Sequence, residues 1–167
     1  MSQMGKKVDI KLVGKADVNE ILDVYLQSED FLALGPQSNA TVQMVEQDIE
    51  EIVREGGNFY GIFDQMRKMI GVVAYVPGNF RNDPAKAFLS LLMISKPYRS
   101  KGVGEEVVVM VEEEVSHDET VNMIESAVQV NNPRAISFWK RNGYRITSRP
   151  QLQSDGTVIY RLQKKIR

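Results

Sequence analysis

Two cationic residues, a hydroxyl and two glycines lie together in the segment Arg99-Ser-Lys-Gly-Val-Gly104, directly after the apolar run Leu91–Ile94. This order predicts a buried strand, a glycine-containing turn and the start of a helix. The first amides of a helix have no internal acceptor, and glycines let them approach an anion closely. The sequence therefore predicts a phosphate-binding turn.

Two common phosphate-binding motifs do not fit this turn. A Walker loop needs G-x-x-x-x-G-K-[ST], which the chain lacks, and a dinucleotide fingerprint needs a third glycine where Val107 stands. What remains is Arg-x-x-Gly-x-Gly at a strand-to-helix junction. Farther along the chain, Asn132-Pro133 and Gly143 are typical of the start and the end of a second helix.

Together the two segments resemble the GNAT superfamily of N-acetyltransferases, over essentially the whole chain. The family's acetyl-CoA signature is R/Q-x-x-G-x-G/A after an apolar strand, and Arg99–Gly104 matches it. The segment Asn132-Pro-Arg-Ala-Ile-Ser-Phe-Trp-Lys-Arg-Asn-Gly-Tyr144 is similar to the family's Asn-x-x-Ala-Ile…aromatic…Gly-aromatic pattern. The resemblance implies acetyl-CoA-dependent transfer of an acetyl group to a primary amine of a small molecule or peptide, by direct attack in a ternary complex.

The resemblance also implies which residues hold acetyl-CoA. Backbone amides would hold the pyrophosphate along Arg99, Ser100, Lys101, Gly102, Val103 and Gly104. The pantetheine arm would bind, in the manner of an added strand, to backbone groups of Leu92, Met93 and Ile94, with Asn132 along the same arm where two parallel strands separate. Two alternatives stay open: Asn132 acts mainly as a helix cap, and Arg99 contributes only its backbone while its side chain forms a surface ion pair.

The residues that would move protons are not assigned. Attack on a thioester needs an unprotonated amine, a donor for the oxyanion and a proton for the leaving thiolate. Trp139 stands where many relatives carry a tyrosine acid, and an indole N–H cannot serve as one. Tyr98 and Tyr144 are the nearest tyrosines, and both also suit a packing role. Glu125 is a candidate base if burial raises its pKa, and an ion-paired glutamate is the alternative.

The acceptor is expected to meet the loop Ser28–Ala40, the start of the following helix and the hairpin Gln151–Gly156. Acidic residues near these segments suggest a cationic amine, although a solvated helix face explains them equally well. They are Glu29, Asp30, Glu46 and Asp48. A rival within the fold uses another acyl-CoA. The rival from another class is a non-catalytic acyl-CoA-binding sensor or partner-binding module.

The composition narrows the function classes. A net charge of −1 with mixed acids and bases disfavours nucleic-acid binding. No apolar run approaches the ~18 residues of a membrane helix, and Met1–Asp9 is too polar for a signal peptide. We therefore expect no membrane partner and a cytoplasmic location. The chain has no cysteine and one histidine, His117, which argues against a metal cofactor and excludes an acyl-cysteine intermediate. A homodimer formed through an edge strand is compatible with the sequence.

The pattern of apolar residues predicts one mixed α/β (α+β) domain over residues 1–167, with a GNAT-like sheet of about seven strands flanked by about four helices. The strands are expected at 8–13, 59–63, 70–76, 87–94, 123–130, 144–147 and 157–162. The helices are expected at 18–26, 41–55, 105–115 and 133–142. The strand Ala87–Ile94 should be buried on both faces, and Ser28–Ala40 should be a loop. Glu105–Val115 is β-branched enough for a strand, but its apolar stripe favours a helix.

Overall fold

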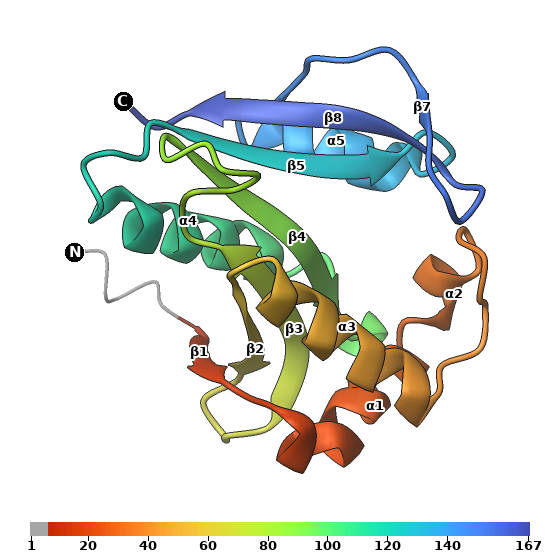
Figure 1. Cartoon of the computed structure of the whole chain (residues 1–167). Helices are drawn as coiled ribbons and strands as arrows, with labels where there is room; N and C mark the ends of the chain where they lie inside the picture. Colours follow the sequence, from red (N-terminus) through yellow and green to blue (C-terminus); the bar gives the residue numbers. More distant parts are fainter. Residues whose placement is uncertain (1–6) are drawn as a thin grey trace.

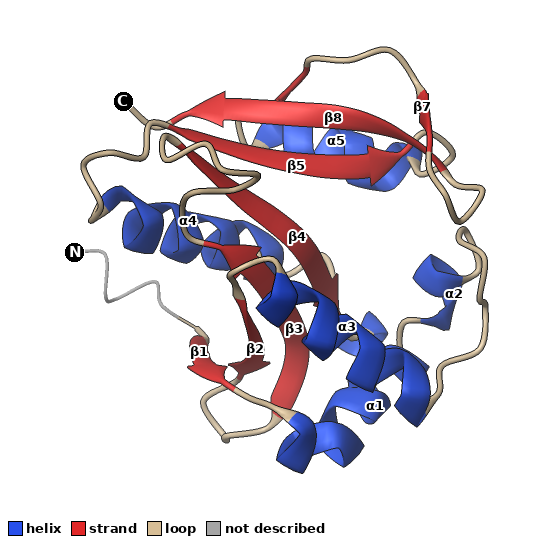
Figure 2. Cartoon of the chain, in the orientation of Figure 1, coloured by secondary structure: helices blue, strands red, loops and turns tan. Residues whose placement is uncertain are grey.

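Eight strands of the computed structural model, which describes residues 7–167, form one mixed sheet (Figures 1 and 2). They are β1 (Asp9–Leu12), β2 (Asn58–Phe63), β3 (Met69–Val76), β4 (Lys86–Ile94), β5 (Met123–Gln129), β6 (Arg145–Ile146), β7 (Gln151–Leu152) and β8 (Val158–Lys165). The order across the sheet is β1-β2-β3-β4-β5-β8-β6, and β7 also pairs with β8. Among these eight strands, β4 and β5 run parallel and every other pair is antiparallel.

Five α-helices in residues 7–167 lie around this sheet. They are α1 (Val18–Leu26), α2 (Glu29–Leu32), α3 (Val42–Arg54), α4 (Val103–Ser116) and α5 (Pro133–Arg141). Helices α1 and α3 pack on one face and α4 and α5 on the other, so the sheet separates two apolar clusters (Figure 1). Within residues 7–167, no helix combines the length and the apolar character needed to cross a membrane.

Helices α4 and α5 form where the sequence predicts them. Val107, Val111 and Val115 of α4 are buried against the sheet, so packing of the apolar stripe outweighs their β-propensity. At the start of α5, the Asn132 side chain accepts a hydrogen bond from the Ala135 amide (3.1 Å). Gly143 follows α5 at φ +91°, a value that favours glycine. The helix interpretation of 105–115 is confirmed.

Two expectations were wrong in detail, the loop at Ser28–Ala40 and the burial of the fourth strand, while the numbers of strands and helices are close to those expected. The segment Ser28–Ala40 contains the short helix α2, and β7 adds a strand, which gives eight strands and five helices. The strand buried at every position is β3, whereas β4 has an exposed residue, Ser90, and several half-buried ones. The reason is a bulge: the register of β3 with β4 passes from Ala74↔Leu91 to Tyr75↔Leu89 and leaves Ser90 unpaired.

Candidate functional site: a fork between two parallel strands

β4 and β5 separate halfway along their length. They pair only from Lys86↔Met123 to Leu89↔Ser126, although β4 continues to Ile94 and β5 to Gln129. At the last pair, the Ser126 hydroxyl donates a hydrogen bond to the Leu89 carbonyl (2.8 Å). Beyond this point the strands diverge, as Figure 1 shows. An extended ligand that enters this fork can form hydrogen bonds with the free edge of β4.

The hydrogen bonds between β3 and β4 determine which backbone groups face the fork. The Ser95 amide donates to the Ile70 carbonyl (2.8 Å), and bonded pairs alternate along an antiparallel ladder. The amide and carbonyl of Met93 therefore point to β3, while those of Leu92 and Ile94 point away from β3, into the fork. The Ile94 carbonyl accepts a hydrogen bond from Arg99 Nε (2.9 Å).

The turn after β4 presents a row of backbone amides. Ser100 and Gly102 adopt positive φ values of 62° and 82°. The first hydrogen bond of α4 runs from the Glu106 amide to the Gly102 carbonyl (3.1 Å). The amides of residues 100–105 have no acceptor in the described part of the chain. Together with the positive end of the helix dipole, they suit an anion.

Two glutamates in the first turn of α4 are directed to other partners. Glu106 accepts hydrogen bonds from the amides of Lys7 and Val8 (2.8 and 3.2 Å). Glu105 lies 3.9 Å from the Arg141 guanidinium. Their carboxylates are therefore engaged with the residues just before β1 and with α5, which reduces their repulsion of an anion at the turn.

Glycine stands at the two positions of the turn for different structural reasons. Gly102 needs its positive φ, and a Cβ there would meet nothing closer than 3.8 Å. Gly104 has no positive φ, but a Cβ on it would lie 2.9 Å from Cε1 of Phe138. The small size of Gly104 therefore permits the close contact between α4 and α5.

The Arg99 side chain forms an ion pair, as the alternative interpretation of this residue expects. Its guanidinium binds the Asp30 carboxylate of α2 through two hydrogen bonds (2.5 and 3.0 Å), and these hold the pKa of Asp30 below its usual value. On the other side of the fork, the Asn131 side chain donates to the Leu34 carbonyl (3.2 Å). The segment with α2 thus lies across the open end of the fork (Figure 1).

Asn132 lies next to Asn131 at the end of β5 and is buried. Its side-chain oxygen caps α5, as the helix-cap interpretation of Asn132 expects. The fork therefore brings the predicted site residues to its two sides: Leu92–Ile94 and Arg99–Gly104 on the β4 side, and Asn132 on the β5 side.

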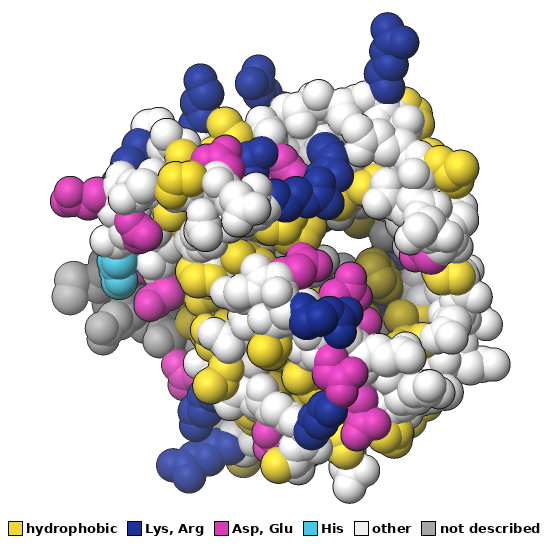
Figure 3. Space-filling model, viewed as in Figure 1, with side chains coloured by type: hydrophobic (Ala, Val, Ile, Leu, Met, Phe, Trp, Pro, Cys, Tyr) yellow, Lys and Arg dark blue, Asp and Glu magenta, His cyan; other side chains and the backbone are white. Residues whose placement is uncertain are grey.

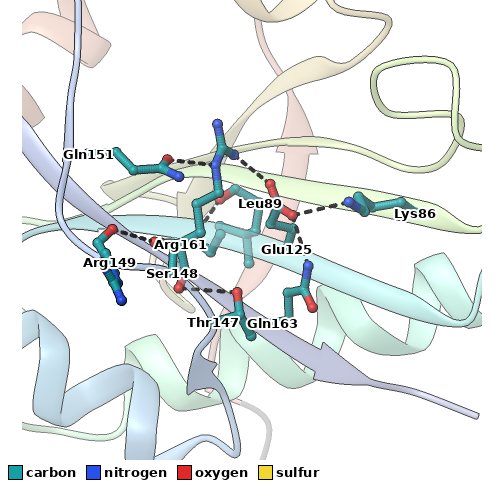
Figure 4. A network of polar contacts seen from close by, with 10 residues as sticks. Lys86, Leu89, Glu125, Thr147, Ser148, Arg149, Gln151, Arg161 and Gln163 are labelled. Carbon is teal, nitrogen blue, oxygen red and sulfur yellow. Dashed lines mark hydrogen bonds and ion pairs between the residues drawn. The ribbon is translucent and has the colours of Figure 1, made fainter.

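Glu125 is buried in an ion-pair network rather than poised as a base (Figure 4). Its carboxylate binds Arg161 (2.7 Å), Lys86 (3.2 Å) and Gln163 (3.1 Å). Burial alone would raise the pKa of Glu125, but these hydrogen bonds and the two positive charges outweigh it, so the pKa is lowered. Arg161 also donates to the Gln151 side chain (2.9 Å) and so holds the β7 hairpin.

The aromatic candidates for an acid have packing roles. Trp139 is buried and contacts Phe138 and Tyr144 edge to face, with ring centroids 5.3 and 4.9 Å apart. The Tyr144 hydroxyl donates to Glu112 (2.9 Å), and burial raises the pKa of Tyr144 far above its ordinary value. Tyr98 is half-buried, and the Lys101 ammonium lies 5.9 Å from its ring centroid.

A cavity of about 140 Å³ beside the bulge of β4 was not predicted. It lies between α3 and the sheet, and its lining comprises Asp48, Glu51, Ile52, Phe59, Ala74, Ser90 and Leu91. The space-filling view shows a hollow on this face of the molecule, with charged side chains of both signs around it (Figure 3). A signal was present in the sequence: Asp48 is a carboxylate spaced four residues from Met44 and from Ile52, on the apolar stripe of α3.

Comparison with known proteins agrees with this architecture. Solved structures with the same fold include an acetyltransferase from Thermus thermophilus, with a TM-score of 0.78 and 20% identity over 96% of this chain and 97% of that chain. AAC(6')-Ib in complex with ribostamycin and coenzyme A has a TM-score of 0.76 and 17% identity, covering 96% and 94% of the two chains. Spermidine N-acetyltransferase from Vibrio cholerae in complex with CoA and spermine has a TM-score of 0.72 and 12% identity, covering 95% of each chain.

The sequence itself carries a family match. No curated protein sequence matches the chain. Residues 10–152, most of the chain, match the acetyltransferase (GNAT) domain. The chain therefore belongs to the GNAT family of N-acetyltransferases.

Proposed function

We propose that this protein transfers an acetyl group from acetyl-CoA to a primary amine of a small molecule or peptide, by direct attack in a ternary complex. One observation carries the proposal: the fork between β4 and β5 opens onto a turn of unpaired amides whose neighbouring glutamates are engaged elsewhere. Two structures of the same fold support it, because they contain coenzyme A with the amines spermine and ribostamycin.

The proposed donor site follows the backbone. The amides of Arg99–Gly104 and the start of α4 would hold the pyrophosphate, with Lys101 adding a positive charge. The pantetheine arm would lie along the free edge of β4, where Leu92 and Ile94 direct backbone groups into the fork. Met93 would support this edge through its pairing with β3. Asn132 would bound the arm on the side of α5.

In the proposed reaction, the amine nitrogen attacks the acetyl carbonyl carbon. A C–N bond forms, the C–S bond breaks, the amine loses a proton and the CoA thiolate gains one. We assign the oxyanion donor to the Leu92 amide, one of the two β4 amides, with that of Ile94, that point into the fork. The chain has no cysteine that could carry an acyl-cysteine intermediate, which supports direct transfer of the acetyl group between the bound substrates. Holding the two substrates together supplies much of the rate.

The donor site is tested by reversing a charge at the turn. We expect Lys101→Glu to weaken acetyl-CoA binding about tenfold, because a carboxylate replaces an ammonium beside the diphosphate. Isothermal titration calorimetry with acetyl-CoA measures this change. Lys165→Glu is the matched control, since Lys165 is also an exposed lysine but lies on β8 opposite Met123, at the end of the sheet where β4 and β5 are still paired. Equal affinities of both variants would contradict the assignment of the turn.

Catalysis is tested separately by release of the CoA thiol. The protein is mixed with acetyl-CoA and a panel of polyamines, amino acids, aminoglycosides and peptides with free N-termini. We expect thiol release with at least one amine and a matching acetylated product by mass spectrometry. Tight binding of acetyl-CoA without turnover across the panel would contradict the proposal and favour an acyl-CoA sensor.

A further inference from the structure

Asp48 is a half-buried carboxylate without a counter-charge, unlike Glu125 and Glu112. Glu125 binds Lys86 and Arg161, and Glu112 binds Lys164 (3.0 Å). Asp48 has no cation within ion-pair distance among residues 7–167. Oδ1 of Asp48 stays accessible to solvent. A carboxylate that is partly removed from water is stabilised by a cation beside it.

The neighbours of Asp48 orient it without neutralising it. Oδ2 accepts a hydrogen bond from the buried Tyr25 hydroxyl (2.6 Å), while Oδ1 accepts none from any described residue. Glu51, three residues farther along α3, lines the same cavity. Burial, followed by the charge of Glu51, raises the pKa of Asp48 above its usual value, although the Tyr25 hydrogen bond opposes this. A cation would relieve both the burial and the repulsion.

The remaining walls of the cavity are mostly apolar and fit an alkyl stem. Ile52, Phe59, Ala74 and Leu91 line it, and Ser90 lies at the bulge. A volume of about 140 Å³ is close to that of a cavity that takes one benzene molecule, so it admits an ammonium group with a few methylenes. A carboxylate on the same ligand would meet the charges of Asp48 and Glu51.

The cavity also lies beside the proposed reaction centre. Ser90 and Leu91 belong to the stretch of β4 that has just separated from β5. The next residue, Leu92, directs its amide into the fork. A group bound between α3 and the bulge is therefore next to the edge of β4 along which the acetyl donor is proposed to lie.

We propose that this cavity binds the acceptor amine in its ammonium form, with Asp48 as the carboxylate that pairs with it; the ammonium releases one proton to solvent before its nitrogen attacks. The acceptor is then a primary amine on an unbranched alkyl chain with no carboxylate near the amine. The role of this cavity as an acceptor site rests on the proposed acetyl transfer, but binding of a cation to it can be measured without acetyl-CoA. Asp48 is proposed to bind the acceptor ammonium and not to take part in the transfer of the acetyl group.

The test compares two ligands and two variants in the absence of acetyl-CoA. Putrescine is an unbranched diamine, and γ-aminobutyrate has a carboxylate in place of its second amine. We expect calorimetry to detect putrescine binding and to find γ-aminobutyrate at least about tenfold weaker. Asp48→Asn, which keeps the size and an acceptor for Tyr25, should weaken putrescine binding about tenfold or more.

Glu50→Gln is the matched control, because Glu50 is an exposed carboxylate on the same helix that pairs with Lys15 and does not line the cavity. It should leave putrescine binding unchanged. Putrescine binding that is equal in wild type and Asp48→Asn, or absent from the wild type, overturns the cation site. If putrescine binds through Asp48 but thiol release stays absent with every amine, the cation site stands and the proposed acetyl transfer fails.

Discussion

At the scale of single residues, the two glycines of the Arg-x-x-Gly-x-Gly motif are needed for different physical reasons. Gly102 is required by its backbone conformation, whereas Gly104 is required by the nearby ring of Phe138. A substitution at Gly104 therefore changes the contact of α4 with α5 as well as any ligand at the turn. The consequence is that loss of acetyl-CoA binding in a Gly104 variant does not by itself locate the phosphate.

We expect Gly104→Ala to destabilise the protein by about 1 kcal/mol, because the new Cβ overlaps the Phe138 ring and forces it to move. In a Phe138→Leu background the overlapping ring atoms are absent. There the same change should be neutral or stabilising, since alanine favours a helix more than glycine. Urea unfolding of the four proteins in the double-mutant cycle measures the difference.

Gly14→Ala serves as the control for this cycle. A Cβ at Gly14 has no neighbour within 4 Å, and Gly14 has an extended backbone that alanine also adopts. The substitution should have little effect in either background. An equal cost of Gly104→Ala with and without the Phe138 ring would show that the overlap is not the reason for glycine at this position.

At the scale of elements, α2 depends on contacts outside itself. A helix of four residues cannot form on its own, because nucleation costs more than its few hydrogen bonds return. Arg99 binds Asp30 within it, and Asn131 binds the Leu34 carbonyl just after it. The two contacts reach the turns after β4 and β5, so the order of this segment is linked to the two sides of the fork.

Asp30→Asn should loosen this segment without unfolding the protein. We expect faster amide hydrogen exchange in residues 29–35 and a change of about 0.5 kcal/mol or less in global stability, since the Arg99 pair is partly exposed. Exchange followed by mass spectrometry resolves the segment. Glu113→Gln on the exposed side of α4 should leave exchange in residues 29–35 unchanged. Unaltered exchange in Asp30→Asn would mean that other contacts hold α2.

The elements that the sequence predicts correctly carry their signals locally. Helix α5 has its cap, its proline and its terminal glycine within Asn132–Gly143, and α4 has a single apolar stripe. Helix α2 has no cap hydrogen bond, and its ion-pair partner Arg99 lies far away in the sequence. The direction of the Leu92 amide depends in the same way on the pairing with β3. Such long-range contacts leave no local pattern to read.

At the scale of the whole molecule, one buried network joins strands from distant parts of the chain. Lys86 on β4, Glu125 on β5 and Arg161 and Gln163 on β8 meet around a single carboxylate (Figure 4). Gln151 extends the network to the β7 hairpin. These contacts lie on the part of the sheet where β4 and β5 still pair, so they reinforce the base of the fork.

Removing the central charge of this network should lower the stability of the whole protein in a pH-dependent way. We expect Glu125→Gln to cost about 3 kcal/mol at pH 7, because Lys86 and Arg161 lose their common partner while only partly exposed. The pKa of Glu125 is lowered by folding, so its stabilising contribution is complete above its unfolded pKa and disappears as the pH falls through the folded value. The difference in unfolding free energy between wild type and Glu125→Gln should therefore shrink below about pH 4. Urea unfolding at several pH values above and below pH 4 measures this difference. Glu119→Gln, at an exposed site, is the control and should match the wild type at every pH. A difference that stays constant with pH would show that the packing of Glu125, rather than its charge, stabilises the protein.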